Sequence, residues 1–572
     1  GFVDRRAEVG EGDKTYQISL ATDSNKEQSS VVLSLSPTVL GTLPTAMKYL
    51  IEYPYGCVEQ TTSRFVPVVI AKVNSGIFTE ALIGKDIDDM IKTGLGRLAN
   101  LQQNDGGWAW WYTGNSDPYI TAYVMDYVGQ VKKLGFEVDE NMWSKAVNYF
   151  TAPYPIDPVT GKEKLPSKED LVAMNYGLMI IGNKDSIRKI EKFDNLSSDL
   201  LSLAVMTNYE LGDKNPETNG LNKLISMAQT QGESLYWDTG SKLNFGSVDA
   251  STALAIRAIL TAGGDRELAT KGVRYITRNR KNEYWSNTFA TAQVIRAVVD
   301  YSNSDNELNP NYSYTVSLDG KKIAQGMVNN SKQVVKDIVV PTKDLQLSSN
   351  LEVTKTGQGQ MYSTLSIKEF HTDRSAAPVS KGLSVVREYV NEKGSEYSLG
   401  VGDVAVVNIT VSGLGMTDYY GLIEDELPAG MVPINQAFNN QQFDNSNSGY
   451  YFYDGVMDRE ITQNGITLSV YQMPAGSRTF TYKARIVSEG NFIVPPAKAM
   501  MMYAPEISGR SSVQTIKIDK ESIFTPRPVS VQKRITAPLK NIVNKAVDYH
   551  IEILITLVLL ISLIVPLGRA RG

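Results

Sequence analysis

The chain has 572 residues, with 57 Lys and Arg against 62 Asp and Glu, one Cys and two His. At ~100 to 200 residues per domain, this length predicts about three to five domains. The single Cys excludes an intramolecular disulfide framework, and the two His, His371 and His550, are too few for a three-His zinc site. The net charge of −5 argues against nucleic acid as a partner, because binding phosphates needs a basic excess. The chain starts at Gly1 without a signal peptide, so we expect a piece of a longer protein.

Alternating apolar residues predict strands in residues 1–36, and a helical period begins at about residue 37. Residues 251–260 resemble residues 290–299, at an offset of 39 residues (290 minus 251). That offset is the length of a helical hairpin, so residues 37–303 are predicted to form a helical repeat domain. A closed α/α toroid suits its length better than an open superhelix. Aromatic residues precede the Thr-Ala helices of this domain, as expected where hairpins turn: Trp108, Trp110, Trp111, Trp237 and Trp285.

The strand pattern returns after the helical domain, with a hairpin signal at Asp319-Gly320. Residues 304–380 are predicted to complete one β-sandwich with residues 1–36, so that the helical domain is an insertion. Residues 381–518 show further strands separated by Gly, Pro and Asn turns, which predicts a second β-sandwich.

The C-terminal residues predict a membrane anchor. Residues 519–548 contain three prolines and are interpreted as a stalk. Residues 549–568 are predicted to form a transmembrane helix, because their last ~16 residues carry no charge and extend about 24 Å as a helix. The short basic tail, residues 569–572, predicts a cytoplasmic end. We therefore expect a single-pass protein of the cell membrane, with most of the chain on the extracytoplasmic side.

The lone cysteine lies in the run PYGCVEQTTSR, residues 54–64, at the start of the helical domain. A Cys and a Gln three residues apart at a helix N-terminus can bring the thiol of Cys57 to the amide carbon of Gln60. Loss of ammonia would then close an internal thioester, an activated acyl group with a thiolate leaving group. Gly56 permits a tight entry to the helix, and Tyr53 and Tyr55 can exclude water. The alternative is that Cys57 is a small buried apolar residue.

The run around Cys57 resembles the thioester signature of the alpha-2-macroglobulin and complement family, in its bacterial form. The segment 101–124 resembles the core of the family's thioester domain, and residues 284–292 resemble its last hairpin. Residues 424–430 and 503–511 are similar to the closing β domain of bacterial members. The resemblance covers nearly all of residues 1–518.

This resemblance implies an α/α toroid thioester domain inserted in a CUB-like β-sandwich, followed by a receptor-binding-like macroglobulin β-sandwich. It assigns Cys57 as the leaving group and Gln60 as the acyl donor, in a signature that also contains Glu59. Bacterial relatives cover the bond with such side chains as Met502 and Tyr503, although ordinary strand packing is an alternative for these two. The cross-link is intramolecular, so no cofactor or metal is expected.

Two departures from the family pattern affect the expected function. Members that acylate hydroxyls use a relay histidine in the thioester domain, and no His precedes His371 here. Direct attack by amines such as lysine side chains is therefore expected. The protease-sensitive bait region of the family is also missing and would lie upstream of Gly1.

The sequence thus predicts an endopeptidase inhibitor, not an enzyme, which traps proteases covalently in bacterial defence at the cell surface. Two alternatives remain: a complement-like covalent surface tag or adhesin, and a binding module with an inactive thioester.

Two further sequence patterns are typical of other enzyme chemistries. Residues 86–89 match the DxDD acid motif of class II terpene cyclases, where the alternative is an acidic first turn of a helix. A Cys-His protease would need to pair Cys57 with His371 across predicted domains.

Overall fold

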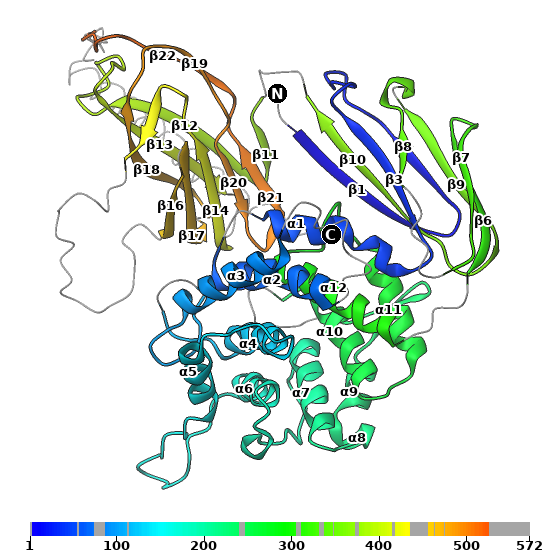
Figure 1. The fold of residues 1–572 in the computed structure, drawn as a ribbon. Helices are drawn as coiled ribbons and strands as arrows, with labels where there is room; N and C mark the ends of the chain where they lie inside the picture. Colours follow the sequence, from blue (N-terminus) through cyan, green and yellow to red (C-terminus); the bar gives the residue numbers. More distant parts are fainter. Residues whose placement is uncertain are drawn as a thin grey trace, which may run out of the picture.

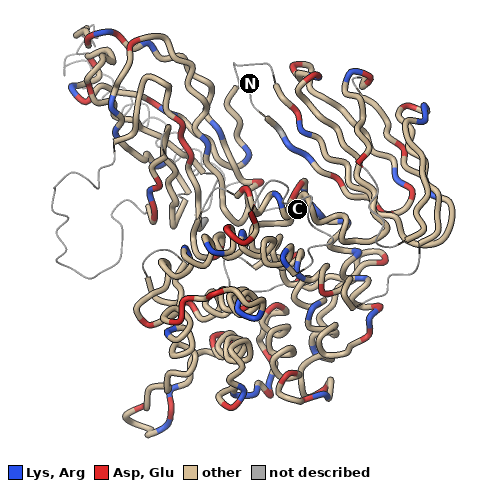
Figure 2. The backbone as a smooth tube through the Cα atoms, in the orientation of Figure 1, with Lys and Arg blue, Asp and Glu red and all other residues tan. Residues whose placement is uncertain are grey.

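The computed structural model consists of a ring of helices with two β-sandwiches beside each other on one side of it (Figure 1). It describes residues 3–53, 56–73, 86–110, 114–238, 246–304, 310–330, 337–346, 348–371, 377–413, 418–434, 456–462, 464–473 and 475–525. Basic and acidic residues are interspersed along the described parts of all three units, and neither sign is gathered on one of them (Figure 2).

The first sandwich is built from two segments that lie far apart in the sequence. Its first strand pairs with its last, from Val3 opposite Phe370 to Glu11 opposite Tyr362. The two antiparallel sheets have the orders β1-β10-β3-β8 and β2-β9-β6-β7, so the helices are inserted between two halves of one sandwich. The strands are β1 (Val3–Glu11), β2 (Lys14–Ile18), β3 (Ser30–Ser36), β6 (Asn311–Leu318), β7 (Lys321–Val328), β8 (Ile338–Val340), β9 (Ser349–Gln358) and β10 (Tyr362–Phe370).

Six helices form the inner ring, and the last of them packs against the first, which closes it. These are α2 (Val58–Val73), α4 (Pro118–Lys133), α6 (Lys168–Ile180), α7 (Ser198–Glu210), α10 (Val248–Thr261) and α12 (Thr288–Asn303). The shorter or more amphipathic outer elements are η1 (Val39–Thr42), α1 (Pro44–Glu52), α3 (Ile87–Leu101), α5 (Glu140–Thr151), η3 (Lys184–Ser186), α8 (Pro216–Asn219), α9 (Leu221–Ser226), the hairpin β4 (Gln229–Gln231) and β5 (Ser234–Tyr236), and α11 (Arg266–Arg278). The inner helices are buried on most faces because they contact neighbours on both sides.

A repeated tryptophan contact explains the Thr-Ala pattern of the sequence. Three buried tryptophans each precede an inner helix and donate their main-chain N–H to the threonine hydroxyl of that helix, at 2.9 to 3.0 Å. Each indole N–H donates to a carbonyl of the preceding outer element, at 2.8 to 2.9 Å. The pairs are Trp108 with Thr121, Trp237 with Thr252 and Trp285 with Thr291. The contact fixes each inner helix to the hairpin before it.

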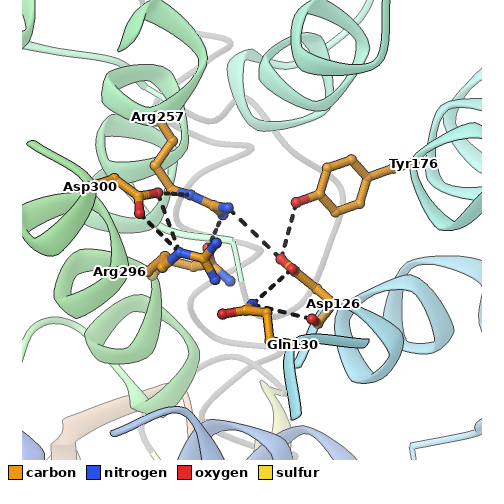
Figure 3. Close-up of polar contacts among 7 residues, drawn as sticks. Asp126, Gln130, Tyr176, Arg257, Arg296 and Asp300 are labelled. Atoms are coloured by element: carbon orange, nitrogen blue, oxygen red, sulfur yellow. Dashed lines mark hydrogen bonds and ion pairs between the residues drawn. The ribbon is translucent and has the colours of Figure 1, made fainter. Parts of the chain in front are cut away.

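A balanced polar cluster joins four inner helices inside the ring (Figure 3). Arg257 Nε donates to Asp300 Oδ2 at 3.1 Å, and its Nη2 lies 3.8 Å from Asp126 Oδ2. Arg296 Nε donates to Asp300 Oδ1 at 3.1 Å, and the Tyr176 hydroxyl donates to Asp126 at 3.0 Å. Two cations thus meet two carboxylates, as buried charges require.

The second sandwich, which we call the closing domain, contains residues 379–518. Its sheets have the orders β11-β21-β20-β14-β17-β16 and β12-β13-β18-β15, with a separate pair β19-β22. Inside it, Arg387 donates to Asp425, which also accepts a hydrogen bond from Tyr482 at 2.7 Å. The strands are β11 (Val379–Lys381), β12 (Leu383–Asn391), β13 (Val404–Gly413), β14 (Asp418–Glu426), β15 (Met431–Pro433), β16 (Val456–Ile461), β17 (Gly465–Met473), β18 (Ser477–Ile486), β19 (Gly490–Val494), β20 (Lys498–Met501), β21 (Ala504–Arg510) and β22 (Gln514–Ile518).

The predicted transmembrane helix and the cell-membrane localisation are corrected. Within the described ranges, no helix has the length and apolar character needed to cross a membrane. The longest described helices have 16 residues and extend about 24 Å, which is shorter than the ~30 Å hydrocarbon core. Residues 549–568, to which the prediction referred, lie outside the described residues, as does the stalk beyond residue 525. Single-pass anchoring is therefore not retained.

Candidate functional site

Cys57 and Gln60 form a reciprocal pair at the start of α2. The Cys57 carbonyl accepts the Thr61 N–H at 2.9 Å, which makes Cys57 the residue that caps the helix. The Gln60 N–H donates to Cys57 Sγ at 3.4 Å, and the Cys57 N–H donates to Gln60 Oε1 at 3.4 Å. This is the geometry of a capping box, with Cys in the position usually held by Ser or Thr. The helix start itself therefore brings the sulfur beside the side-chain amide.

The backbone on either side of Cys57 is held by hydrogen bonds to other segments of the ring. The Gly56 carbonyl accepts a hydrogen bond from Arg97 Nη2 at 3.3 Å. A Cβ on Gly56 would lie 1.7 Å from the same nitrogen, so any larger residue would displace the guanidinium. On the other side, the Val58 N–H donates to the Trp110 carbonyl at 3.0 Å. The entry to α2 is thus fixed by α3 and by the segment that follows it.

Glu59 is fully buried and hydrogen-bonded by hydroxyl groups. Thr288 at the start of α12 donates to Glu59 Oε2 at 2.9 Å, Ser63 donates to Oε1, and Tyr503 of the closing domain donates to Oε2 at 3.1 Å. Burial raises the pKa of Glu59 to about 7, and the three hydrogen bonds oppose this shift in part.

The closing domain covers the pair with apolar side chains. Cys57, Tyr420, Leu422 and Met502 form one buried cluster, with Tyr503 packed against it. Gln60 Nε2 donates to Met502 Sδ at 3.4 Å. Cys57 and Gln60 are each 1% exposed, and burial raises the pKa of the Cys57 thiol. The pair therefore lies in a dry environment that joins the ring to the closing domain.

Tyr53 packs against the same cluster and meets Tyr49 edge to face, with ring centroids 5.7 Å apart. Tyr49 in turn stacks on Tyr284, from the loop before α12, at 4.6 Å. Tyr55, named from the sequence as a further water-excluding residue, lies outside the described residues.

Several residues of the site were missed by the sequence analysis. Trp110 stacks on Tyr420 with ring centroids 5.0 Å apart, and it meets the Tyr503 ring edge to face with centroids 5.8 Å apart. Tyr420 has a φ of +63°, which is rare for a bulky residue, although the register of β14 with β17 continues unchanged across it. Thr288 and Arg97 also reach the site from distant helices. Only Trp110 had a sequence signal, since it belongs to the Trp-rich segment before a Thr-Ala helix.

The described residues do not form a site for a Cys-His protease, for the DxDD acid motif or for a metal ion. His371 lies at the edge of the first sandwich, where its Nδ1 is 3.0 Å from Asp23 Oδ1, and it is not in the Cys57 cluster. The Asp86 carboxylate caps α3 by accepting the N–H groups of Asp88 and Asp89, which is a structural role. Within the described ranges, His, Cys, Asp and Glu side chains form no group of three that could hold a metal ion.

Comparisons with known proteins agree with this arrangement. Residues 29–153 match the family model of the A-macroglobulin TED domain, and residues 382–506 match that of the bacterial alpha-2-macroglobulin MG10 domain. Among curated relatives, alpha-2-macroglobulin of Thermotoga maritima is 26% identical over 344 residues, or 60% of this chain. Alpha-2-macroglobulin of Escherichia coli is 22% identical over 503 residues, or 82% of this chain. The matches span only 19% and 29% of these relatives' own lengths.

The fold is also that of solved structures. Native alpha-2-macroglobulin of Escherichia coli, from domain MG7 to the C-terminus, has a TM-score of 0.68 at 17% identity and covers 90% of this chain and 82% of its own. Salmonella alpha-2-macroglobulin reacted with methylamine has a TM-score of 0.65 at 19% identity, covering 90% of this chain and 34% of its own. The two domain models, the curated relatives and the fold thus agree that the chain resembles the C-terminal portion of bacterial alpha-2-macroglobulins.

Proposed function

We propose that Cys57 and Gln60 are joined by an internal thioester that captures proteases covalently. Its formation replaces the Gln60 amide by a Cys57 Sγ–carbonyl bond and releases ammonia. The observation that carries this proposal is the reciprocal capping contact of the two residues, buried under Met502 and Tyr503. A thioester in this position is activated toward nucleophiles and protected from water by its surroundings.

The reaction with a target amine balances without a cofactor. A lysine amine attacks the carbonyl carbon of Gln60, the bond to Cys57 Sγ breaks, and the thiolate takes up a proton. Gln60 ends as an amide of the lysine, and Cys57 ends as a free thiol. Each molecule reacts once because nothing in this step restores the thioester, so the protein acts as an inhibitor and not as a turnover enzyme.

Amines are the favoured targets because the sequence has no histidine between Cys57 and His371 to relay the acyl group to a hydroxyl. Capture of proteases is supported by the relatives, whose names are alpha-2-macroglobulin. Opening of the contact between the closing domain and the ring is the step that would expose Gln60 to the target. Met502 and Tyr503 serve in this proposal as the shield.

The proposal is tested on the full-length protein with methylamine, followed by thiol titration and mass analysis of the peptide that contains residues 57–60. We expect one thiol to appear per chain and Gln60 to carry methylamide, as Salmonella alpha-2-macroglobulin has also been reacted with methylamine. A Cys57→Ala variant is the control and should release no thiol. A thiol that titrates fully before methylamine is added would show an inactive site.

Capture is tested by mixing the protein with a protease and with the same protease after methylation of its lysines. We expect a covalent adduct that survives denaturation only with unmodified lysines. Equal labelling of both proteases would refute amine capture, and labelling of cell surfaces without protease activity would support the surface-tag alternative.

A further inference from the structure

Glu59 differs from several other acids of this chain in having no cation paired with it. Asp126 and Asp300 meet two arginines inside the ring, and Asp425 meets Arg387 in the closing domain. Among the described residues, none of the lysine, arginine or histidine side chains forms an ion pair with Glu59, whose exposure is 0%. An ionised carboxylate in such a place is costly, because hydroxyl groups replace only part of its hydration.

The groups that face Glu59 come from every element packed around it and are all neutral. They are Tyr49 of α1, Cys57 before α2, Ser63 of α2, Tyr123 of α4, Thr288 of α12 and Tyr503 of the closing domain. The N-terminal dipole of α2 favours the anion only modestly, as is usual for a single charge near a helix end. This is too little to offset full burial.

The Tyr503 hydroxyl makes Glu59 part of the contact between two domains. Tyr503 lies in the turn between β20 and β21, whose ends meet the ring beside α2 (Figure 1). Its hydroxyl donates to Glu59 Oε2 at 3.1 Å, while its ring faces Trp110. Separation of the two domains would break this bond and admit water to the carboxyl.

We propose that Glu59 is a positioning residue that makes the seating of Tyr503 over the Cys57 and Gln60 pair depend on a proton. The inference rests on the proposed thioester function and adds a regulation to the same site. With its proton, Glu59 is neutral, and the hydroxyls around it can reorient to satisfy it as donor or acceptor. Without its proton, the buried anion is better solvated in the opened arrangement, so the closing domain is released more readily.

The direction in which pH changes the open fraction follows from the linkage between proton binding by Glu59 and seating of the closing domain. The closed arrangement raises the pKa of Glu59 to about 7 from the ordinary 4.5, so it binds the proton more tightly than the open arrangement. The proton on Glu59 therefore stabilises the closed arrangement fully when the pH is below the ordinary pKa of 4.5. This stabilisation is lost as the pH rises toward 7. If the opened carboxyl regains its ordinary value, the open fraction rises by about 70-fold between pH 5 and pH 8.

The test measures thiol release by hydroxylamine in the full-length protein across this pH range. Hydroxylamine is a much weaker base than an alkylamine, so it stays usable as a nucleophile down to pH 5, and the ratio of wild-type to Glu59→Gln rates cancels its own titration. We expect this ratio to rise by tens of fold from pH 5 to pH 8. A ratio that stays constant while both proteins release thiol overturns the inference.

Two further variants keep the test decisive. Glu506→Gln removes an exposed acid on β21 that pairs with Lys281 across the same contact at 3.7 Å, and it should keep the wild-type pH profile. Tyr503→Phe removes one donor to the Glu59 anion but keeps the ring, so release should be faster and should continue to rise above pH 8. If Glu59→Gln does not fold, a Tyr503→Phe profile equal to that of wild type overturns the inference. Absence of thiol release from wild type would instead refute the thioester.

Discussion

Truncation of Met502 to alanine tests whether the closing domain protects the reactive pair. Met502 is 2% exposed and accepts a hydrogen bond from Gln60 Nε2, in the cluster that joins both domains. Its neighbour Met501 is also 2% exposed but lies in the interior of the closing domain. The two residues have the same side chain and the same burial and differ in the core to which they belong, so Met501→Ala is a matched control.

Burying a methionine side chain stabilises a core by about 2 to 5 kcal/mol relative to alanine. For Met502 this loss falls on the contact between domains, because Cys57 belongs to the ring and Leu422 to the closing domain. If Met502→Ala lowers the free energy that favours the closed arrangement by about 2 to 3 kcal/mol, the open fraction rises by about 30- to 150-fold, because about 1.4 kcal/mol corresponds to a factor of ten. Met501→Ala should lower the stability of the closing domain by a similar amount and leave closure nearly unchanged.

The assay is the rate of thiol release by methylamine, with thermal unfolding of each variant measured in parallel. Met502→Ala should accelerate release by about 30-fold or more with a small change in melting temperature. Met501→Ala should lower the melting temperature without this acceleration. Equal release rates for the two variants would refute the reasoning, because the shield would then be indistinguishable from general stability.

Three further substitutions test the packing around the site, each by chemical denaturation against wild type. Gly177→Ala places a Cβ 2.1 Å from Phe150, between α5 and α6, and should destabilise the ring by about 1 to 3 kcal/mol. Trp237→Phe loses the indole hydrogen bond of 2.8 Å to the Leu224 carbonyl, which keeps its bond from the Met227 N–H, for a loss of about 0.5 to 1.5 kcal/mol. Asp425→Asn leaves Arg387 buried without its carboxylate and should lower the stability of the closing domain by about 3 to 5 kcal/mol. An unchanged midpoint for any of the three would contradict its contact.

Local patterns were the parts of the fold most accessible from the sequence. The Thr-Ala helices after tryptophan are visible because the Trp and Thr contacts lie within about one hairpin, as for Trp285 and Thr291. The Asp319-Gly320 hairpin is visible because positive φ at both residues needs this residue chemistry. The membrane helix was wrong because an apolar run alone fixes neither a helix nor its surroundings, and the longest described helices are too short to span a bilayer.

Only part of the candidate site could be predicted from the sequence, because only some of its contacts are between residues close in the chain. Cys57 and Gln60 are three residues apart, so their capping contact follows from the helix start and is encoded locally. Tyr420 reaches the pair from a distant strand, and Thr288 reaches Glu59 only because the ring closes. Neither contact has a signature in a single sequence, because each depends on how domains and helices pack.

Local contacts at the start of α2 and distant contacts with the closing domain are expected to have different roles. The local contacts would allow the proposed thioester to form, and the distant contacts would control when it is exposed. Both partners of the capping contact lie in the first turn of α2, so we expect the proposed thioester between Cys57 and Gln60 to depend on the ring and not on the closing domain. Exclusion of water and amines is assigned in the proposed function to Met502 and Tyr503, which are adjacent in the closing domain and would leave the site together if that domain moved. Substitutions at the start of α2 should therefore abolish thiol release, whereas substitutions of the shielding residues in the closing domain should increase its rate. A variant of the closing domain that folds but can no longer form the bond would contradict this separation.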